Sequence, residues 1–386
     1  MLPTSSAQRI ETLDILRGLA LFGMFVVHFH IHTPEIGGID DVIRTLVWRL
    51  VESKSHGTFA ILFGAGFALQ FRRAEEQGRP LIARYLRRLG VLAVFGFIAH
   101  AFFGFNVLLG YAIWGVPLLL IRNWSTRRLI LVAVLSAASL GLYHLAAHTY
   151  LNLKGGPGLV ETTYGAQRAQ AISTNDALEA AEAQPHYSVL LVARLRHMAW
   201  FYAQPFFFMP GATITLFVVG MLLVRHRVFE EPRAHTRLLV GMMIFGLVSW
   251  IADNWLLPYW GLASLGQLRD QWLTFTYLAG ALLLLSRNPG LIARLRPVAN
   301  AGRMALTNYL LQIAALDLLF SGYALGLGEI RPLYVPAAAV ACFAAEMVFG
   351  TIWLSSFRFG PAEWLWRSLT YGQMQALRHQ QLVRAT

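Results

Sequence analysis

Two ionisable side chains, Arg17 and His28, lie in the first long apolar segment, LDILRGLALFGMFVVHFHIHT, residues 13–33. The helix between them is about 16.5 Å long, roughly half of a hydrocarbon core of about 30 Å. With Arg17 at the membrane boundary, His28 therefore lies deep in the membrane. Ionisable groups at that depth are functional candidates, and a histidine with a pKa of about 6.5 can accept and release a proton near neutral pH. We therefore expect a catalytic set of His28, Arg17 and Asp14.

A structural interpretation of the same residues stays open. Arg17 can reach lipid phosphates or pair with Asp14 three residues earlier, and His28 can simply hydrogen-bond a neighbouring helix.

Three arginines, Arg84, Arg87 and Arg88, follow the second apolar segment. The guanidinium group matches the geometry of phosphate oxygens, so these residues are candidates for binding a phosphorylated ligand. Anchoring to anionic lipid head groups is the alternative.

Other polar residues are weaker candidates, because each also fits a structural role: His30, His100, Asn106, Arg303, Asn308, Glu346, Glu363 and Arg367. No metal site is expected, since the chain has neither a His-Glu-x-x-His pattern nor more than one cysteine, Cys342.

The composition indicates whether the chain lies in water or in a membrane. Of 386 residues, 56% are hydrophobic and 13% charged, whereas soluble chains carry about 25% charged residues. We expect an all-α, polytopic membrane protein forming a single domain over 1–386, without internal repeats. Its ten expected spans are 15–31, 58–71, 89–103, 107–121, 129–151, 206–224, 238–257, 271–286, 305–320 and 335–355.

The distribution of arginine and lysine predicts the orientation. Placing both termini in the cytoplasm puts 23 of the 32 cations on that side, as the positive-inside rule requires. Membrane lipids then account for most of the net charge of +12, and we expect no nucleic-acid partner.

Three segments outside the expected spans also have an expected location. The polar stretch 152–187 is expected as an extracytoplasmic loop. The stretch 188–205 is apolar but interrupted by charges, so it is expected to be interfacial or re-entrant. An amphipathic helix over 42–51 should lie on the outer surface.

Several motifs carry a resemblance to a known family. Leu13-Asp14, Arg17-Gly18 and a histidine eleven residues after the arginine resemble the start of the transmembrane acyltransferase superfamily, which includes acyltransferase-3 and heparan-glucosaminide N-acetyltransferase relatives. The segments FAILFGAGFALQFRR and RYLRRLGVL are similar to its next helices, with Ala65 in place of a serine. GFIAHAFFGFNVLLGYAIWG, AGRMALTNYLLQ and FRFGPAEWLWRSLTYG resemble the YeiB-like family, which makes 287–386 a family-specific region. Asn106 stands where that family is expected to have an aspartate.

This resemblance implies acyl transfer across a bacterial inner membrane. An acyl group such as acetyl would pass from cytoplasmic acyl-coenzyme A, a co-substrate rather than a tightly bound cofactor, to an extracytoplasmic glycan, lipid or small molecule. His28 would be base or acyl carrier, and the arginines at 84–88 would bind the donor. A transporter or lipid-moving protein using the Arg17–His28 line as a pathway is the alternative, and a homo-oligomer is also open.

Overall fold

A computed structural model describes residues 10–104, 106–204, 207, 211–256, 268 and 271–379. Some residues on which the sequence-based predictions rest lie outside the described residues. They are Arg9, which is among the counted cations, residues 205, 206 and 257 at the ends of expected segments, and 380–386 in the family-specific region. Within the described residues the chain is helical, with an isolated bridge between Phe357 and Arg378. In chain order the helices of the N-terminal half are α1 (Glu11–His30), α2 (Ile39–Leu50), α3 (Lys54–Glu76), α4 (Ile82–Phe103), α5 (Leu108–Gly115), α6 (Leu118–Ile121), α7 (Thr126–Glu182) and α8 (Tyr187–Ala203).

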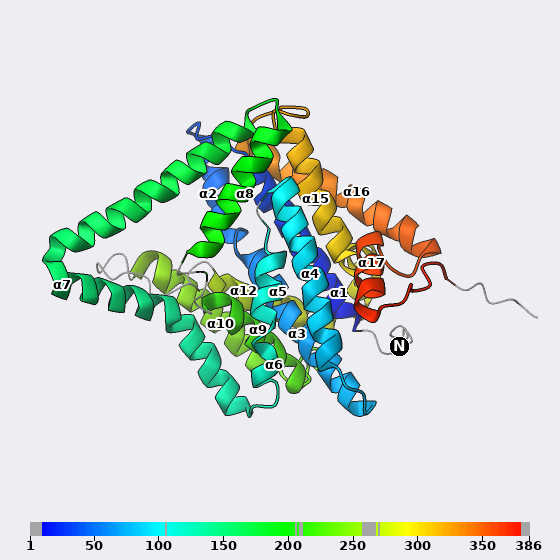
Figure 1. The fold of residues 1–386 in the computed structure, drawn as a ribbon. Coiled ribbons are helices and arrows are strands. Elements are labelled where there is room, and N and C mark those ends of the chain that lie inside the picture. Colours follow the sequence, from blue (N-terminus) through cyan, green and yellow to red (C-terminus); the bar gives the residue numbers. More distant parts are fainter. Residues whose placement is uncertain are drawn as a thin grey trace, which may run out of the picture.

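The C-terminal half continues in the same way. Its helices are α9 (Gly211–Arg225), α10 (Thr236–Ile251), η3 (Ala252–Leu256), α12 (Trp272–Arg287), α13 (Pro289–Arg294), α14 (Arg296–Arg303), α15 (Ala305–Phe320), η5 (Pro332–Tyr334), α16 (Val335–Ser356) and α17 (Pro361–Tyr371). Figure 1 shows most of them as one bundle, with α7 extending away from it and returning where α8 begins.

Five described helical segments are long and apolar enough to cross a membrane. They are 11–30, 82–103, the apolar part of 126–182, 236–255 and 332–356. Four shorter apolar helices lie at 108–121, 211–225, 272–287 and 305–320. The expectation of an all-helical membrane protein is thus confirmed, while the count of ten spans remains a prediction.

Helix α1 is the central element of the part that holds the site, because it packs on α3, α14, α15 and α16. It approaches α14 with direct backbone contact. A Cβ on Gly18 would lie 2.2 Å from the Val298 carbonyl oxygen, and one on Gly302 would lie 1.9 Å from that of Asp14. Small residues allow such close packing between membrane helices. Arg17 precedes Gly18 and Arg303 follows Gly302, so the crossing brings the backbones that carry these two arginines close together.

The two glycines of the FGAGF segment have different roles. Gly64 faces α9, where an added Cβ would lie 1.9 Å from the Phe217 carbonyl oxygen, so it allows close packing as its sequence suggests. Gly66 has no atom within 4 Å of such a Cβ and instead lines an internal cavity. Gly64 therefore serves helix packing, whereas Gly66 leaves space in the cavity.

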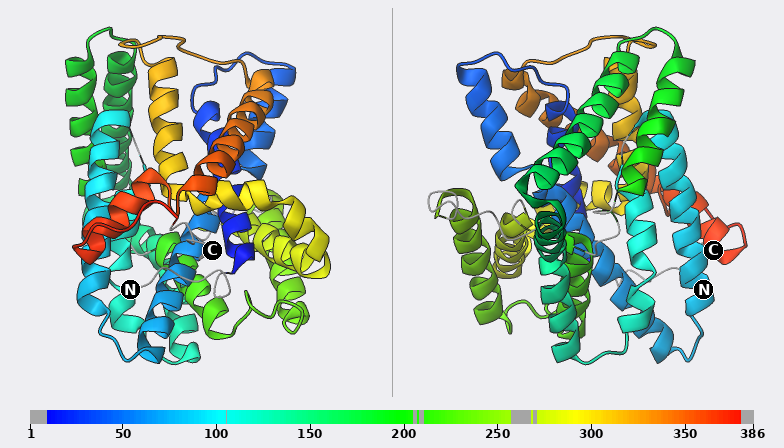
Figure 2. Two further views of the ribbon diagram at one scale, coloured as in Figure 1. Left: turned by 90° about the vertical axis from the view of Figure 1, so that its right-hand side faces the viewer. Right: turned by 60° about the vertical axis from the view of Figure 1, so that its left-hand side comes forward.

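Several loops that the sequence assigns to opposite sides lie at opposite ends of the bundle, whereas α17, assigned to the cytoplasmic side, lies near its middle (Figure 2). At one end, Arg225 donates to the Arg122 and Trp124 carbonyls, and Arg72 pairs with Glu230. At the other end, the Gly322 amide donates to the Glu182 carbonyl, Ile330 to His32, and Arg331 pairs with Asp40 at 2.7 Å. This grouping agrees with the alternation of loops expected from sequence, and the cytoplasmic location of the termini stays a prediction.

The polar stretch 152–187 is helical through Glu182 instead of forming a loop. Its alanine, glutamate and glutamine residues are strong helix formers, which explains the difference. The backbone leaves helical geometry at Gly156 (φ 72°), just before Pro157, and this kink separates the polar part of α7 from its apolar part.

The stretch 188–205 also forms a regular helix, α8, over nearly all of its length. It packs on α4 and α7. Its buried Arg194 is neutralised by Asp317, so a charge that interrupts the apolar pattern is accommodated inside the bundle.

The amphipathic segment over 42–51 forms helix α2, which contacts α1 and η5. Val47 is buried, while Val42 and Leu46 of the apolar stripe are exposed on the molecule.

Candidate functional site

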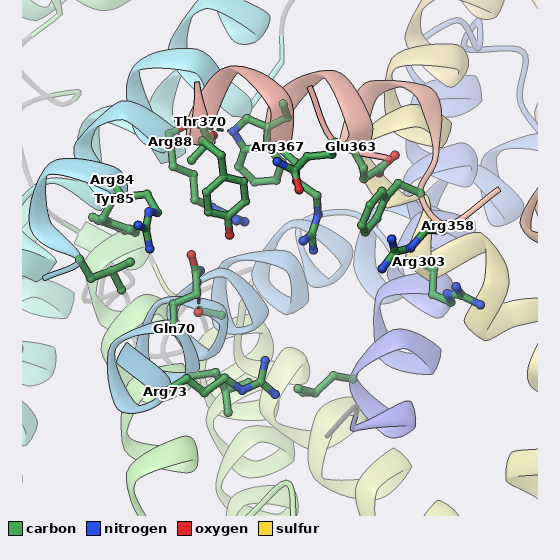
Figure 3. A pocket seen from close by; sticks show the side chains of 18 of the residues that line it. Gln70, Arg73, Arg84, Tyr85, Arg88, Arg303, Arg358, Glu363, Arg367 and Thr370 are labelled. Atoms are coloured by element: carbon green, nitrogen blue, oxygen red, sulfur yellow. Dashed lines mark hydrogen bonds between the residues drawn. The ribbon is translucent and has the colours of Figure 1, made fainter. Parts of the chain in front are cut away.

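The candidate site is a cavity of about 820 Å³ between α1, α3, α4 and α17. Eight arginines line it: Arg17, Arg73, Arg79, Arg84, Arg88, Arg303, Arg358 and Arg367. The acidic residues in its lining are Asp14 and Glu363. Figure 3 shows Arg88 and Arg367 pointing into this space from α4 and α17, with Gln70 and Arg73 on the facing helix α3. This excess of guanidinium groups suits a ligand with several phosphates.

A smaller space of about 270 Å³ adjoins this cavity and shares ten lining residues with it, including Arg17, Arg88 and Arg303. The residues that line the smaller space alone are mostly apolar or aromatic: Met24, Phe59, Leu62, Phe63, Phe67, Leu92, Val107, Leu108, Gly302, Ala305, Leu306, Tyr111 and Tyr309. We name the two parts the arginine cavity and the apolar branch. Together they offer a cationic mouth followed by an uncharged channel.

Helix geometry explains how the chain brings two of the three predicted donor-site arginines to the cavity. Arg84 and Arg88 are four residues apart on α4, so they share one face of the helix, and both line the arginine cavity. Arg87 faces outward and is exposed. Its guanidinium lies close to Gly372, at the end of α17, and outside the cavity lining.

Arg17 and Asp14 form the ion pair that their spacing suggests, with Nη1 2.8 Å from Oδ1. Both residues nevertheless line the arginine cavity and the apolar branch. Pairing and cavity lining are therefore compatible, and the pair marks the point where the two parts meet.

His28 lies deeper along α1 and is one side chain away from the cavity. Its ring centroid is 5.8 Å from that of Tyr309, which lines the apolar branch. The Nδ1 atom of His28 is buried and has no hydrogen-bond partner among the described residues. His32, one turn further on, stacks on Phe320 at 4.3 Å.

Three of the weaker candidates have structural partners. Asn106 donates to the Gly96 carbonyl at 3.0 Å and accepts from the Leu108 amide at 3.1 Å, which fixes the break between α4 and α5. Asn308 donates to the Ala301 carbonyl. Glu346 has an uncharged partner, because the Gln312 side-chain amide nitrogen lies 3.2 and 3.3 Å from its two carboxylate oxygens.

Glu363 stabilises the start of α15. Its carboxylate accepts from the backbone amides of Leu306 and Thr307 at 2.6 and 3.1 Å and from the Thr307 hydroxyl. Burial raises the pKa of the Glu363 carboxyl, while hydrogen bonds from Thr307 and Leu306 act in the opposite direction. Glu363 thus caps a helix and fixes α17 against it.

His30 and His100 lie away from the cavity lining. His30 is 3.8 Å from Glu52 at the end where α1 terminates. His100 is buried on α4, with the rings of His197 and Tyr202 at 6.3 and 5.8 Å. Arg303 and Arg367, by contrast, line both parts of the cavity.

Several lining residues were not among the sequence candidates: Gln70, Arg73, Arg79, Tyr85, Tyr111, Tyr309, Arg358, Trp366 and Tyr371. Tyr309 and Trp366 lie inside the family-like motifs AGRMALTNYLLQ and FRFGPAEWLWRSLTYG, which could have identified them. In the described part of the chain, no group of three or more His, Cys, Asp or Glu side chains could hold a metal ion.

Comparisons with known proteins find two matching parts of the chain. Residues 9–155 match the family model described as heparan-alpha-glucosaminide N-acetyltransferase, catalytic. Residues 223–373 match the model of a protein family of unknown function, DUF418. The first match contains α1, α3 and α4, and the second contains α14, α15 and α17, so both contribute to the cavity. No solved structure matches the chain.

Relatives extend the match over nearly the whole chain. The uncharacterized protein YxaH of Bacillus subtilis is 29% identical, with 97% of each chain covered. An uncharacterized 39.9 kDa protein from the amylase 3′ region of Bacillus acidopullulyticus is also 29% identical, with 96% of each covered. The uncharacterized protein YeiB of Escherichia coli is 49% identical over 19% of each chain. The chain is thus similar to the YeiB-like family, and its N-terminal part is similar to an N-acetyltransferase catalytic domain.

Proposed function

We propose that this protein is a membrane acyltransferase that takes an acyl group from cytoplasmic acyl-coenzyme A. The observation that carries the proposal is the arginine cavity continuing into the apolar branch. Coenzyme A has the same two-part character, with charged phosphates at one end and an uncharged pantetheine arm bearing the thioester at the other. The arginines match the phosphates, and the branch matches the arm.

The direction of the branch supports His28 as the reacting residue. A thioester carried along the branch would come near Tyr309, whose ring is 5.8 Å from that of His28. Histidine can accept a proton at neutral pH, and its Nδ1 here has no competing partner among the described residues.

In the direct-transfer form of the reaction, an acceptor hydroxyl or amine loses its proton to His28 and its oxygen or nitrogen attacks the thioester carbonyl carbon. The carbon–sulfur bond breaks as the ester or amide bond forms. The proton then passes from His28 to the departing thiolate, which gives free coenzyme A. No electrons are exchanged and no further co-reactant is needed.

The acceptor would approach from the end of the bundle opposite the arginine cavity. A glycan, a lipid or a small molecule each meets the chemical requirement of a free hydroxyl or amine. The proposed site of this reaction is the inner membrane of a bacterium, with the arginine cavity on the cytoplasmic side, as the cation distribution suggests. Acyl-coenzyme A enters and leaves as a co-substrate.

Isothermal titration of the detergent-purified protein with acetyl-coenzyme A tests the donor site. The matched variants are Arg88→Ala with Arg303→Ala, both in the cavity lining, and Arg127→Ala with Arg294→Ala, both exposed and outside it. We expect the first pair to weaken binding at least tenfold and the second pair to leave it unchanged.

A wild-type protein that binds no acetyl or longer-chain thioester would contradict the donor assignment and favour a transporter. A transporter has no need of coenzyme A, and its substrate would use the polar line from Arg17 to His28 as a pathway.

A further inference from the structure

Three arginines of the arginine cavity have their guanidinium groups over aromatic rings from one short stretch of sequence, FRFGPAEWLWRSLTYG, residues 357–372. The guanidinium carbon of Arg88 lies 3.8 Å from the centroid of the Trp366 ring. The corresponding distances are 4.6 Å for Arg367 over Phe359 and 5.4 Å for Arg84 over Tyr371. All six residues line the cavity.

Contacts between guanidinium groups and aromatic rings can lower the free-energy cost of ordering the arginines when a ligand binds. Long arginine side chains that surround one space repel each other and have many rotamers, so ordering them when a ligand binds costs free energy. An aromatic face attracts the guanidinium and restricts its movement, and the edge of a guanidinium is the part that donates hydrogen bonds to phosphate oxygens.

The rings are held in place by contacts that do not involve the cavity arginines' charged groups. The Trp366 indole N–H donates to the Arg88 backbone carbonyl at 3.0 Å, which fixes α17 on α4. The Thr307 hydroxyl accepts from the Ala362 amide at 3.0 Å, and Glu363 caps α15. Pro361 begins α17, and Gly372 (φ 66°) ends it.

We propose that this C-terminal block is part of the donor site, with Trp366, Phe359 and Tyr371 as positioning residues that hold Arg88, Arg367 and Arg84 ready for the phosphates of the ligand. The inference rests on the proposed function for the identity of that ligand. It gives the block, which lies far in sequence from Arg17 and His28, a role in recognising the phosphorylated part of the donor.

The test measures binding of acetyl-coenzyme A and, separately, of inorganic pyrophosphate to the detergent-purified full chain. Trp366→Leu removes the ring, and Trp366→Phe keeps a ring but loses the indole N–H. Trp364→Leu is the matched control, because Trp364 lies on the same helix, donates to the Gln375 carbonyl at 2.7 Å and is outside the cavity lining.

We expect Trp366→Leu to weaken binding of both ligands about tenfold, Trp366→Phe to restore it to within about threefold, and Trp364→Leu to leave it unchanged. A purely structural role is excluded by a double-mutant cycle with Arg88→Ala. If Trp366 acts through Arg88, Trp366→Leu weakens binding much less in the Arg88→Ala protein than in the wild type.

The outcomes separate this inference from the proposed function. Equal losses in both backgrounds, or no loss from Trp366→Leu, would overturn the positioning role even if acetyl-coenzyme A binds. Pyrophosphate binding that follows the expected pattern without any binding of acetyl-coenzyme A would support the positioning role and overturn the donor assignment. A wild type that binds neither ligand would overturn both.

Discussion

Arg194 of α8 donates to both carboxylate oxygens of Asp317 on α15, and both side chains are buried. Arg194 also donates to the Phe102 carbonyl of α4 at 2.6 Å. The Tyr323 and Ser321 hydroxyls donate to Asp317 at 2.7 and 2.6 Å. This network joins three helices at the end of the bundle opposite the arginine cavity.

Removing one member of this pair should destabilise the protein strongly. Breaking a buried ion pair leaves an unpaired charge and costs about 3–5 kcal/mol. We expect Arg194→Met to lower the melting temperature in detergent far more than Arg196→Met, a matched change of an exposed arginine on the same helix. The double variant Arg194→Met with Asp317→Leu should recover part of the loss. A single variant as stable as the wild type would show that the pair contributes nothing.

Much of this arrangement could be predicted from the sequence, because apolar length and periodicity set the helices. The four-residue spacing of Arg84 and Arg88 puts both on one face of a helix. The three-residue spacing of Asp14 and Arg17 likewise indicates their ion pair. Local patterns do not report which distant segments meet. The contribution of Arg358 and Trp366 to the cavity depends on how α17 packs across α4 and α15, which no local spacing shows.

The same limit applies to the stretch 188–205. A charged residue inside an apolar stretch suggests that the stretch lies outside the bundle, unless a neutralising partner can be identified. The partner of Arg194 is Asp317, which is too distant in sequence to be identified from a local pattern. Arg87 shows the converse case. It is adjacent to Arg88 and chemically identical, but the helix turns it outward, so sequence alone could not separate the two.

Filling the cavity from Gly66 should block donor binding without unfolding the protein. Gly66 lines both the arginine cavity and the apolar branch, and an added Cβ would meet no atom within 4 Å. We expect Gly66→Leu to weaken acetyl-coenzyme A binding at least tenfold, because the side chain occupies space that the ligand needs. Gly90→Leu, on the exposed face of α4 and equally free of contacts, is the control. Unchanged affinity in Gly66→Leu would place the donor elsewhere.

The Glu363 carboxyl should make stability depend on pH. Burial raises its pKa above the ordinary value of 4.5. A folded state that binds the proton more tightly than the unfolded state is stabilised at low pH, and this contribution is lost as the pH rises through the raised pKa. Compared with Glu363→Gln, which does not titrate, the wild type should therefore lose melting temperature as the pH is raised from about 4.5 to about 8. A constant difference between the two proteins over that range would contradict the raised pKa.

Replacing His28 should separate catalysis from donor binding. His28 lies outside the lining of both parts of the cavity, so His28→Ala should bind acetyl-coenzyme A with nearly the affinity of the wild type. Loss of a general base reduces the rate about 10²- to 10⁴-fold. The assay would follow release of free coenzyme A by the wild type in membranes that contain the native acceptor, with His144→Ala, an exposed histidine on α7, as the control. Full activity in His28→Ala would move the chemistry to another residue, whereas loss of both binding and turnover would indicate a structural role for His28.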